Sequence, residues 1–140
     1  MTRIDFYVLN DSQAHARQVL ACKLAQKAMR SGYRVFLHTA DPAQTKSMDD
    51  LLWTFSQKSF VPHTTVAEEA SSVPVYIAHD DEPQDIHDVL INLHPDTPTC
   101  FSRFERMAEL LDQAPETLKA GRERYRFYQD RGYPLQTHKL

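Results

Sequence analysis

The chain has 140 residues, of which 41% are hydrophobic and 25% charged, and its formal net charge at pH 7 is −3. This length and composition are typical of one globular unit with its own core, so we predict a single domain over residues 1–140. The sequence has no run of 18 apolar residues and no basic start followed by an apolar stretch, so we expect a cytoplasmic protein without a membrane span or secretory signal. An acidic chain also argues against non-specific DNA binding by the whole surface.

The first strand and helix are indicated near the start of the chain. Ile4–Leu9 is rich in β-branched and aromatic residues, which predicts a strand. Ser12 is placed to cap a helix that runs to about Arg30, with alanines and leucines spaced along one buried stripe. Gly32 is expected to end this helix in the left-handed conformation.

The same pattern then repeats. Arg34–Thr39 reads as a second strand, and Asp41 followed by Pro42 predicts the start of a helix that continues to about Trp53. Strand, helix, strand and helix in this order favour a right-handed βαβ unit. We therefore predict an α/β fold with three α/β/α layers around a mostly parallel, mixed sheet of Rossmann-like type.

The middle of the chain is less regular. Val73–Ala78 and Val89–Leu93 are expected to form two further short strands, joined by an acidic loop. Residues 101–111 fit the spacing of a helix and also that of an edge strand, and periodicity alone does not decide between them.

The C-terminal region carries a helix with a distinct character, predicted over about 117–131. We expect Pro115 to break the chain before it and Asp112 or Thr117 to cap it. Residues 117–140 contain six Lys or Arg against two Asp or Glu, net +4, whereas the first 116 contain ten against seventeen, net −7. Aromatic residues lie among the arginines, so we expect one face to pack on the domain and another to remain basic. Such a patch suggests an anionic partner, although a merely solvated terminal helix has the same composition.

Sites for catalysis, nucleotides and metals are weakly indicated. None of the three glycines lies in a strand-to-helix turn, where phosphate-binding loops need them, so we predict no nucleotide cofactor. Cys22 and Cys100 stand far apart and are expected to be buried thiols. His79–Asp88 is rich in possible ligands but matches no zinc or calcium spacing, so we predict no metal site.

Two apolar features outside the expected strands are candidates for binding. Trp53 closes an amphipathic helix, where a tryptophan serves either the core or an interface. Phe60-Val61 lies in a loop-like stretch and is a candidate exposed patch.

The chain resembles the chi subunit of bacterial DNA polymerase III holoenzyme over essentially its whole length. The resemblance rests on an ordered set of short motifs, of which the spacing from the tryptophan to Ser-Phe-Val-Pro-His and the Arg-Glu-Arg-Tyr helix are the most specific. The motifs are Asp5–Leu9, Arg30–Val35, Leu51–Trp53, Ser59–His63, Asp88–Leu93, Phe101–Phe104 and Arg122–Tyr128.

This resemblance implies a non-catalytic accessory subunit of the replicative clamp loader, with no catalytic site of its own, at bacterial replication forks. The implied partners are the psi subunit, in a one-to-one heterodimer that tethers the chain to the clamp loader, and the acidic, Phe-terminated tail of single-stranded-DNA-binding protein. DNA is implied to be contacted only indirectly, and no membrane is involved.

The resemblance also implies roles for individual residues. Arg122 matches the position that pairs with the terminal carboxylate of the tail, and Tyr125, Trp53 and Leu111 match positions in or near the apolar pocket. Phe60, with neighbouring Val61, matches the psi interface, and Arg106–Leu111 is implied to be a strand.

One position departs from the family pattern. The family lysine one helical turn before Arg122 is replaced by Leu118, and Lys119 lies one residue later, about 100° around the helix. Lys119 is therefore the substitute candidate for that tail contact.

Two other functions remain open from the sequence. The first is a small α/β hydrolase or metal-dependent enzyme that uses the His79–Asp88 loop, for which a bound metal would be diagnostic. The second is direct binding of single-stranded DNA by Arg122, Arg124 and Arg126 with the neighbouring tyrosines, which an oligonucleotide titration would detect.

Overall fold

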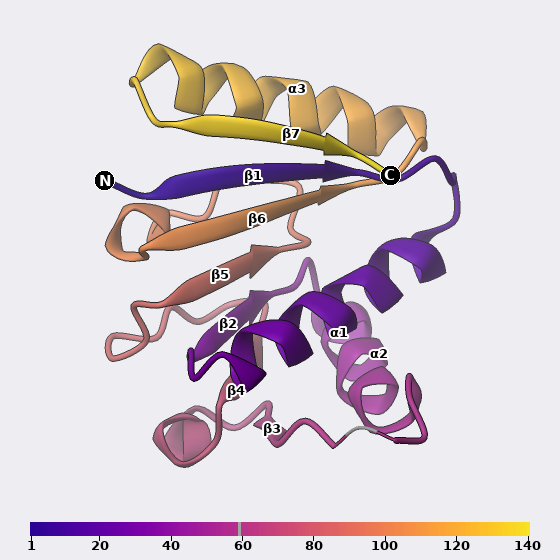
Figure 1. The fold of residues 1–140 in the computed structure, drawn as a ribbon, viewed down its shortest axis with the longest axis vertical. Helices are drawn as coiled ribbons and strands as arrows, with labels where there is room; N and C mark the ends of the chain where they lie inside the picture. The colour runs from indigo at the N-terminus through magenta and orange to yellow at the C-terminus, as the bar shows by residue number, and fades with distance from the viewer. Residues whose placement is uncertain (59) are drawn as a thin grey trace.

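A computed structural model describes residues 1–58 and 60–140; Ser59, part of the Ser-Phe-Val-Pro-His motif, lies outside the described residues. The described part forms one sheet with helices on its two faces (Figure 1). Its elements in chain order are β1 (Arg3–Val8), α1 (Ala14–Arg30), β2 (Val35–His38), α2 (Pro42–Thr54), β3 (His63–Thr64), η1 (Ala67–Ser72), β4 (Val75–Ala78), β5 (Val89–Asn92), η2 (Phe101–Arg103), β6 (Arg106–Leu111), α3 (Pro115–Asp130) and β7 (Leu135–Lys139).

The sheet has the spatial order β3-β4-β2-β5-β6-β1-β7 among the described residues. Every pairing between neighbouring strands is parallel, so the α/β class is confirmed but the expected mixed character of the sheet is not. β1 lies between β6 and β7, so the beginning of the chain pairs with two strands from its C-terminal part (Figure 1).

Alternation along the strands divides the core into two layers. In β2, the side chains of Val35 and Leu37 enter the layer that contains α1 and α2, whereas Phe36 enters the layer that contains Tyr128 of α3. Successive side chains of a strand point to opposite faces of a sheet. The helices α1 and α2 therefore cover one face, and α3 covers the other.

The two N-terminal helices begin for different local reasons. Asp41 caps α2 as predicted, because its Oδ1 accepts a hydrogen bond from the Gln44 backbone N–H at 2.8 Å and Pro42 occupies the first turn. The prediction that Ser12 caps α1 is wrong: the N-cap is Gln13, whose side chain makes no capping bond. Gly32 has φ +85°, as expected for the residue that ends α1.

The start of α3 also differs from the prediction. Pro115 lies in the first turn of the helix instead of breaking the chain before it, since proline needs no N–H donor at that position. The N-cap is Ala114, without a side-chain cap bond, so neither Asp112 nor Thr117 caps the helix. Asp112 instead accepts a hydrogen bond from the Ala114 N–H at 3.0 Å.

Three regions that periodicity left undecided or unassigned are strands. Arg106–Leu111 forms β6, in agreement with the family resemblance, and it follows the short turn η2. Both edge strands, β3 and β7, were not anticipated from the sequence. β3 has two residues, and β7 alternates polar side chains without an apolar run, so neither produces a strand pattern.

A glycine lets α3 approach the sheet closely. A Cβ added at Gly121 would lie 2.6 Å from both terminal methyl carbons of Leu111 and 3.2 Å from its Cγ. Leu111 is itself buried and packed in the α3-side core. The glycine that weakens the helix, by about 1 kcal/mol relative to alanine, therefore provides the space that β6 occupies.

We expect Gly121→Ala to lower the free energy of unfolding in the wild-type background, because overpacking costs about 1–3 kcal/mol. In a Leu111→Ala background the same change should raise it by about 1 kcal/mol, the gain in helix propensity. Urea titration of the four proteins measures this coupling. Equal effects in the two backgrounds would show that the contact with Leu111 is not the reason for the glycine.

Candidate functional site

The outer surface of α3 presents the basic residues predicted for tail binding. Arg122 and Lys119 are exposed, whereas Tyr125 is half-buried and packs edge-on against Phe6 of β1, with ring centroids 5.1 Å apart. Leu111 is buried beneath Gly121, so it supports this part of the helix without an exposed surface of its own. Arg122, Tyr125 and Lys119 thus lie on one helix with a polar outer side and an aromatic residue at its edge.

The second arginine of the Arg-Glu-Arg-Tyr motif has a different role. Arg124 points into the protein, and its Nε donates a hydrogen bond to Glu109 Oε2 at 3.0 Å, with side-chain exposures of 5% and 0%. Its Nη1 donates to the carbonyl of Pro95 at 2.6 Å. Arg124 therefore does not lie on the surface with Arg122 and Arg126, as the alternative of direct single-stranded-DNA binding requires.

Glu109 is the centre of a buried polar network. Tyr128 donates its hydroxyl hydrogen to Oε2 at 2.6 Å, and Asn92 donates from Nδ2 to Oε1 at 2.9 Å. Burial and the neighbouring carboxylate raise the pKa of Tyr128, so its phenol stays protonated and remains a donor. The sequence signal for this network is a glutamate inside the otherwise apolar run Met107–Leu111, in a segment whose periodicity fits both a helix and a strand.

The other predicted residues form an aromatic cluster at the opposite end of the sheet. Trp53 at the end of α2 and Phe60 are 55% and 61% exposed, and their ring centroids lie 5.3 Å apart. The ring of His63 lies 4.8 Å from that of Trp53 and has a fully buried side chain. Val61 is fully buried in the core beneath α1 and α2, so only Phe60 of the Phe60-Val61 pair offers a surface to a partner.

The structure does not bring Trp53 together with Arg122 and Tyr125. Trp53 belongs to α2, which packs on β4 and β3, whereas Arg122 belongs to α3, which packs on β6 from the other face of the sheet. Figure 1 shows these two helices at opposite ends of the molecule. The single pocket expected around Arg122 therefore separates into two surfaces, one basic on α3 and one aromatic beside α2.

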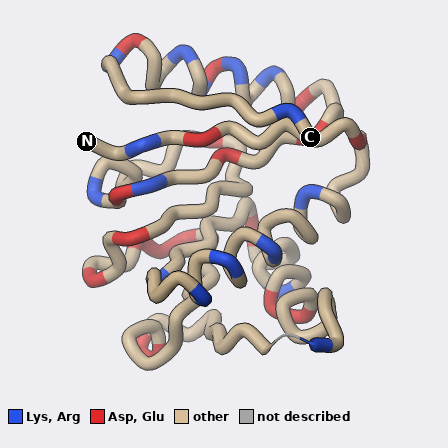
Figure 2. The backbone as a smooth tube through the Cα atoms, in the orientation of Figure 1, with Lys and Arg blue, Asp and Glu red and all other residues tan. Residues whose placement is uncertain are grey.

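Charge is distributed unevenly over the helices. Figure 2 shows basic and acidic residues interspersed along α3, whereas α1 carries basic residues alone. The sequence of α1 contains four Lys or Arg and no Asp or Glu. This basic helix lies within the first 116 residues, whose net charge is −7.

The acidic loop proposed for a metal-dependent enzyme is fastened to the domain by its own side chains. Asp88 accepts a hydrogen bond from the Arg34 backbone N–H at 2.7 Å, and Asp85 lies 3.5 Å from the Arg34 guanidinium. Asp81 accepts from the Tyr76 hydroxyl at 2.6 Å. Within residues 1–58 and 60–140, no three His, Cys, Asp or Glu side chains are grouped as metal ligands.

Both cysteines are buried free thiols, as predicted. Burial raises the pKa of Cys22 to about 12 and also raises that of Cys100. Because the thiolate is the reactive form, these side chains serve as small core residues. No helix in the described part of the chain has the length and apolar character needed to cross a membrane.

Comparisons with known proteins connect this structure to a family. Residues 1–136 match the family described as "DNA polymerase III chi subunit, HolC". A DNA polymerase III subunit chi from Pseudomonas aeruginosa is 44% identical over 140 residues, which covers 100% of this chain and 98% of that protein. The Escherichia coli DNA polymerase III subunit chi is 30% identical over 143 residues, which covers 98% of this chain and 97% of that protein.

A solved structure supports the fold alone. The crystal structure of T4 UvsW matches with a TM-score of 0.69 at 12% identity, covering 99% of this chain and 41% of the other. At this identity the likeness concerns the arrangement of helices and strands, and it carries no argument about activity.

Mutation of the buried Arg124 should destabilise the protein, whereas mutation of the exposed Arg122 should not. Arg124→Met leaves Glu109 as a buried charge without its cation, so we expect the free energy of unfolding to fall by about 3–5 kcal/mol. Arg122→Ala is the matched control on the same helix and should change stability by less than about 0.5 kcal/mol.

Urea unfolding measures both variants, and Glu109→Gln in the Arg124→Met background should recover part of the loss by removing the unpaired charge. Equal stability of the two single variants would contradict the structural role given to Arg124.

Proposed function

The chain belongs to the DNA polymerase III chi subunit family, and we propose that it links the psi subunit to the acidic tail of single-stranded-DNA-binding protein during DNA replication. Psi would bind one-to-one and tether the chain to the clamp loader. The observation that carries this proposal is that the molecule exposes two chemically different surfaces, one on α3 and one beside α2. These two helices cover opposite faces of the sheet. A linking protein needs two sites that both partners can occupy together.

The α3 surface suits the tail of single-stranded-DNA-binding protein. Arg122 is exposed and carries a planar guanidinium, which binds a carboxylate through two parallel hydrogen bonds. Tyr125 offers an apolar ring edge for the terminal phenylalanine, and Leu111 holds the underlying backbone in place. Lys119 lies one turn before Glu123 on the exposed side, where it adds long-range attraction for an acidic peptide.

The aromatic cluster beside α2 suits the psi subunit. Trp53 and Phe60 together expose more apolar surface than an isolated side chain, and tryptophan and phenylalanine are enriched in the cores of stable interfaces. We assign Trp53 to this interface instead of the tail pocket because it packs against Phe60 and lies on the face of the sheet away from Arg122. Val61 contributes by anchoring the loop in the core.

We expect Arg122→Ala to weaken binding of the tail peptide by about 1.5–3 kcal/mol, the range for a hydrogen bond to a charged group. A fluorescent acidic peptide that ends in Asp-Phe, titrated by anisotropy at two salt concentrations, measures the change. Arg126→Ala removes the same charge one turn further along α3 and should reduce affinity much less. If the two variants lose equal affinity, only diffuse attraction is involved and the carboxylate site is wrong.

Phe60→Ala should weaken binding of purified psi subunit by about 2 kcal/mol or more, the loss typical of an aromatic hot-spot residue. The same variant should bind the Asp-Phe peptide like wild type, because Phe60 lies on another surface. Calorimetric titration with psi and anisotropy with the peptide test both statements, and unchanged psi affinity would exclude the aromatic cluster from that interface.

A further inference from the structure

Part of one sheet face is left without a helix. On the side of α1, the helices cover β3, β4, β2, β5 and β6, whereas β1 and β7 lie beyond them at the edge of the sheet in the described part of the chain (Figure 1). Ile4 and Phe6 of β1 enter the core under α3, so the intervening Asp5 and Tyr7 point to the bare side. His138 of β7 stacks on Tyr7 there, with ring centroids 4.7 Å apart.

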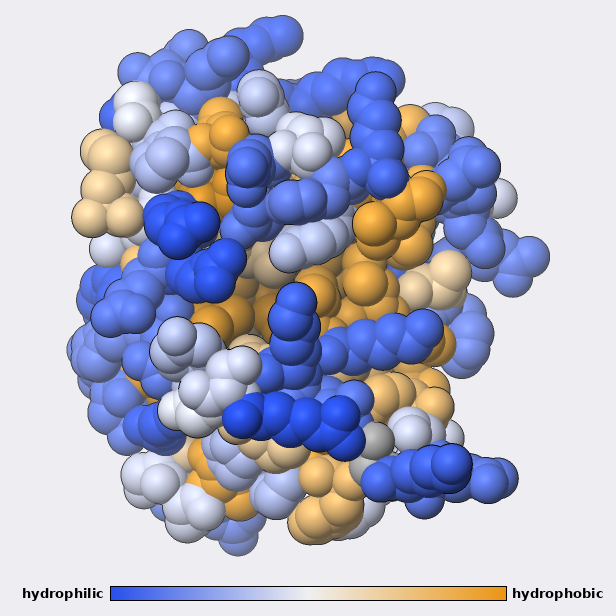
Figure 3. All heavy atoms as spheres, in the orientation of Figure 1, coloured by the Kyte–Doolittle hydropathy of each residue, from blue (hydrophilic) through white to orange (hydrophobic). Residues whose placement is uncertain are grey.

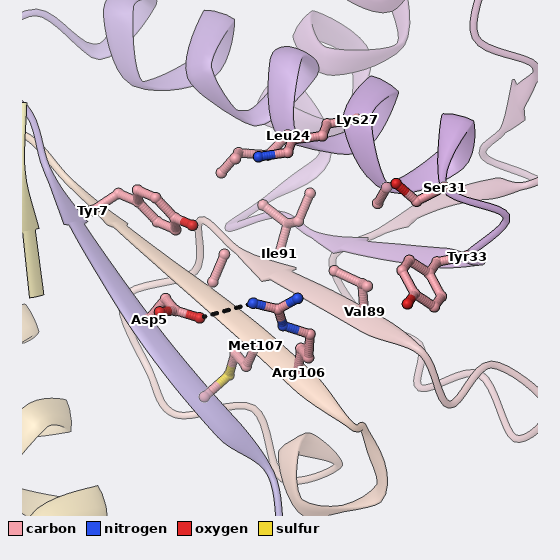
Figure 4. Close-up of a pocket in the computed structure, with 12 residues that line it drawn as sticks. Asp5, Tyr7, Leu24, Lys27, Ser31, Tyr33, Val89, Ile91, Arg106 and Met107 are labelled. Carbon is pink, nitrogen blue, oxygen red and sulfur yellow. Dashed lines mark ion pairs between the residues drawn. The ribbon is translucent and has the colours of Figure 1, made fainter. Parts of the chain in front are cut away.

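A hollow of about 130 Å³ opens where α1 ends and the bare strands begin. Figure 4 shows Ile91 and Val89 at its floor, Leu24 of α1 above them, and Tyr7 and Tyr33 at its rim. Figure 3, which views this face, shows hydrophobic residues in a depression surrounded by hydrophilic ones. A cavity of about 150 Å³ lined by apolar side chains holds one benzene ring, so the hollow, which is open to solvent, is of a similar size to one apolar side chain of a ligand.

The rim of the hollow is positively charged. Lys27 and Arg106 line it, and Lys23 is exposed one helical turn before Lys27. Arg3 and Arg106 are direct neighbours in the pairing of β1 with β6, on the same sheet face, although like charges in such positions are destabilising.

Asp5 is the one carboxylate among the described residues that line the hollow. Asp5 lies 3.8 Å from Arg106 and 2.9 Å from His138, so it is already shared between two partners. Burial and Asp5 raise the pKa of Tyr7, which keeps its phenol neutral and able to donate at the rim. An anionic ligand would relieve the repulsion between Arg3 and Arg106 and find donors on both sides of the hollow.

We propose that this face is a second docking site, for an acidic segment of a protein partner that places one aromatic or aliphatic side chain in the hollow. Its flanking carboxylates would pair with Lys27 and Lys23 on α1 and with Arg106 and Arg3 on the strands. An apolar anchor in a pocket with charges around it is a common form of peptide recognition. The net charge of −3 favours a short acidic segment over a long polyanion such as single-stranded DNA. This site is independent of the function proposed above.

The probe is a C-terminally amidated peptide, Asp-Glu-Asp-Phe-Asp-Glu-amide, which lacks the terminal carboxylate assigned to Arg122. We expect it to shift the amide resonances of Leu24, Lys27, Ile91 and Ala108 in heteronuclear NMR spectra of the full chain, with saturable dependence on peptide concentration. The same peptide with alanine in place of phenylalanine should bind at least tenfold more weakly.

Two surface variants test the site on the protein. Lys27→Glu reverses an exposed charge on a helix and should weaken binding of the probe at least tenfold. Ala28→Phe should also reduce binding, because the larger side chain fills the hollow while the charges stay unchanged. Arg122→Ala is the control, which should bind the probe like wild type. Folding of each variant is checked by its dispersed amide spectrum.

The proposal is overturned if saturating probe leaves those four resonances unmoved, if Lys27→Glu binds like wild type, or if an oligothymidylate displaces the probe at equal concentration. Because Arg122→Ala removes the tail surface but not this one, failure here is distinguishable from failure of the proposed tail binding.

Discussion

The buried carboxylate of Glu109 is the constraint on which the arrangement of α3 depends. A charge without exposure must be paired and hydrogen-bonded, and Glu109 receives donors from Arg124 and Tyr128 of α3 and from Asn92 of β5. These bonds fix both the rotation and the position of α3 on the sheet, and Gly121 sets how closely it approaches. With Arg124 turned inward, the 3.6-residue period of the helix places Arg122 outward. The burial of Arg124 thus determines that Arg122 lies on the exposed side of α3.

The parallel sheet separates the functional surfaces. α1 and α2 lie on one face of the sheet and α3 on the other. Trp53 and Arg122, which the family resemblance assigns to one pocket, therefore lie on opposite sides of the molecule. Trp53 and Phe60 share one surface, and Arg122 and Tyr125 share another. Partners that bound these two surfaces would not compete for space, which is the physical requirement for the proposed link between the clamp loader and single-stranded-DNA-binding protein.

Sequence patterns predicted the parts of this fold that carry strong local signals. Asp41 with Pro42, and Gly32 after α1, marked helix ends because capping depends on a few adjacent residues. β7 was missed because its pairing with β1 spans most of the chain and leaves no apolar run. The exposure of Arg122 agrees with the position implied by the family motif. The burial of Arg124 could not be predicted, since its partner Glu109 comes from a segment that periodicity did not assign to a strand or a helix. Likewise, the exposure of Trp53 and the burial of Val61 depend on tertiary packing.

The most direct test of the linking role is the affinity of the Asp-Phe tail peptide for the chain alone and for the chain saturated with psi subunit, measured by calorimetry. Independent surfaces predict the same dissociation constant within about twofold, since sites without coupling leave each other's free energy unchanged. They also predict a complex of one chain, one psi and one peptide in sedimentation analysis. Displacement of psi by the peptide, or loss of peptide affinity in the presence of psi, would show that the surfaces overlap and would contradict the account.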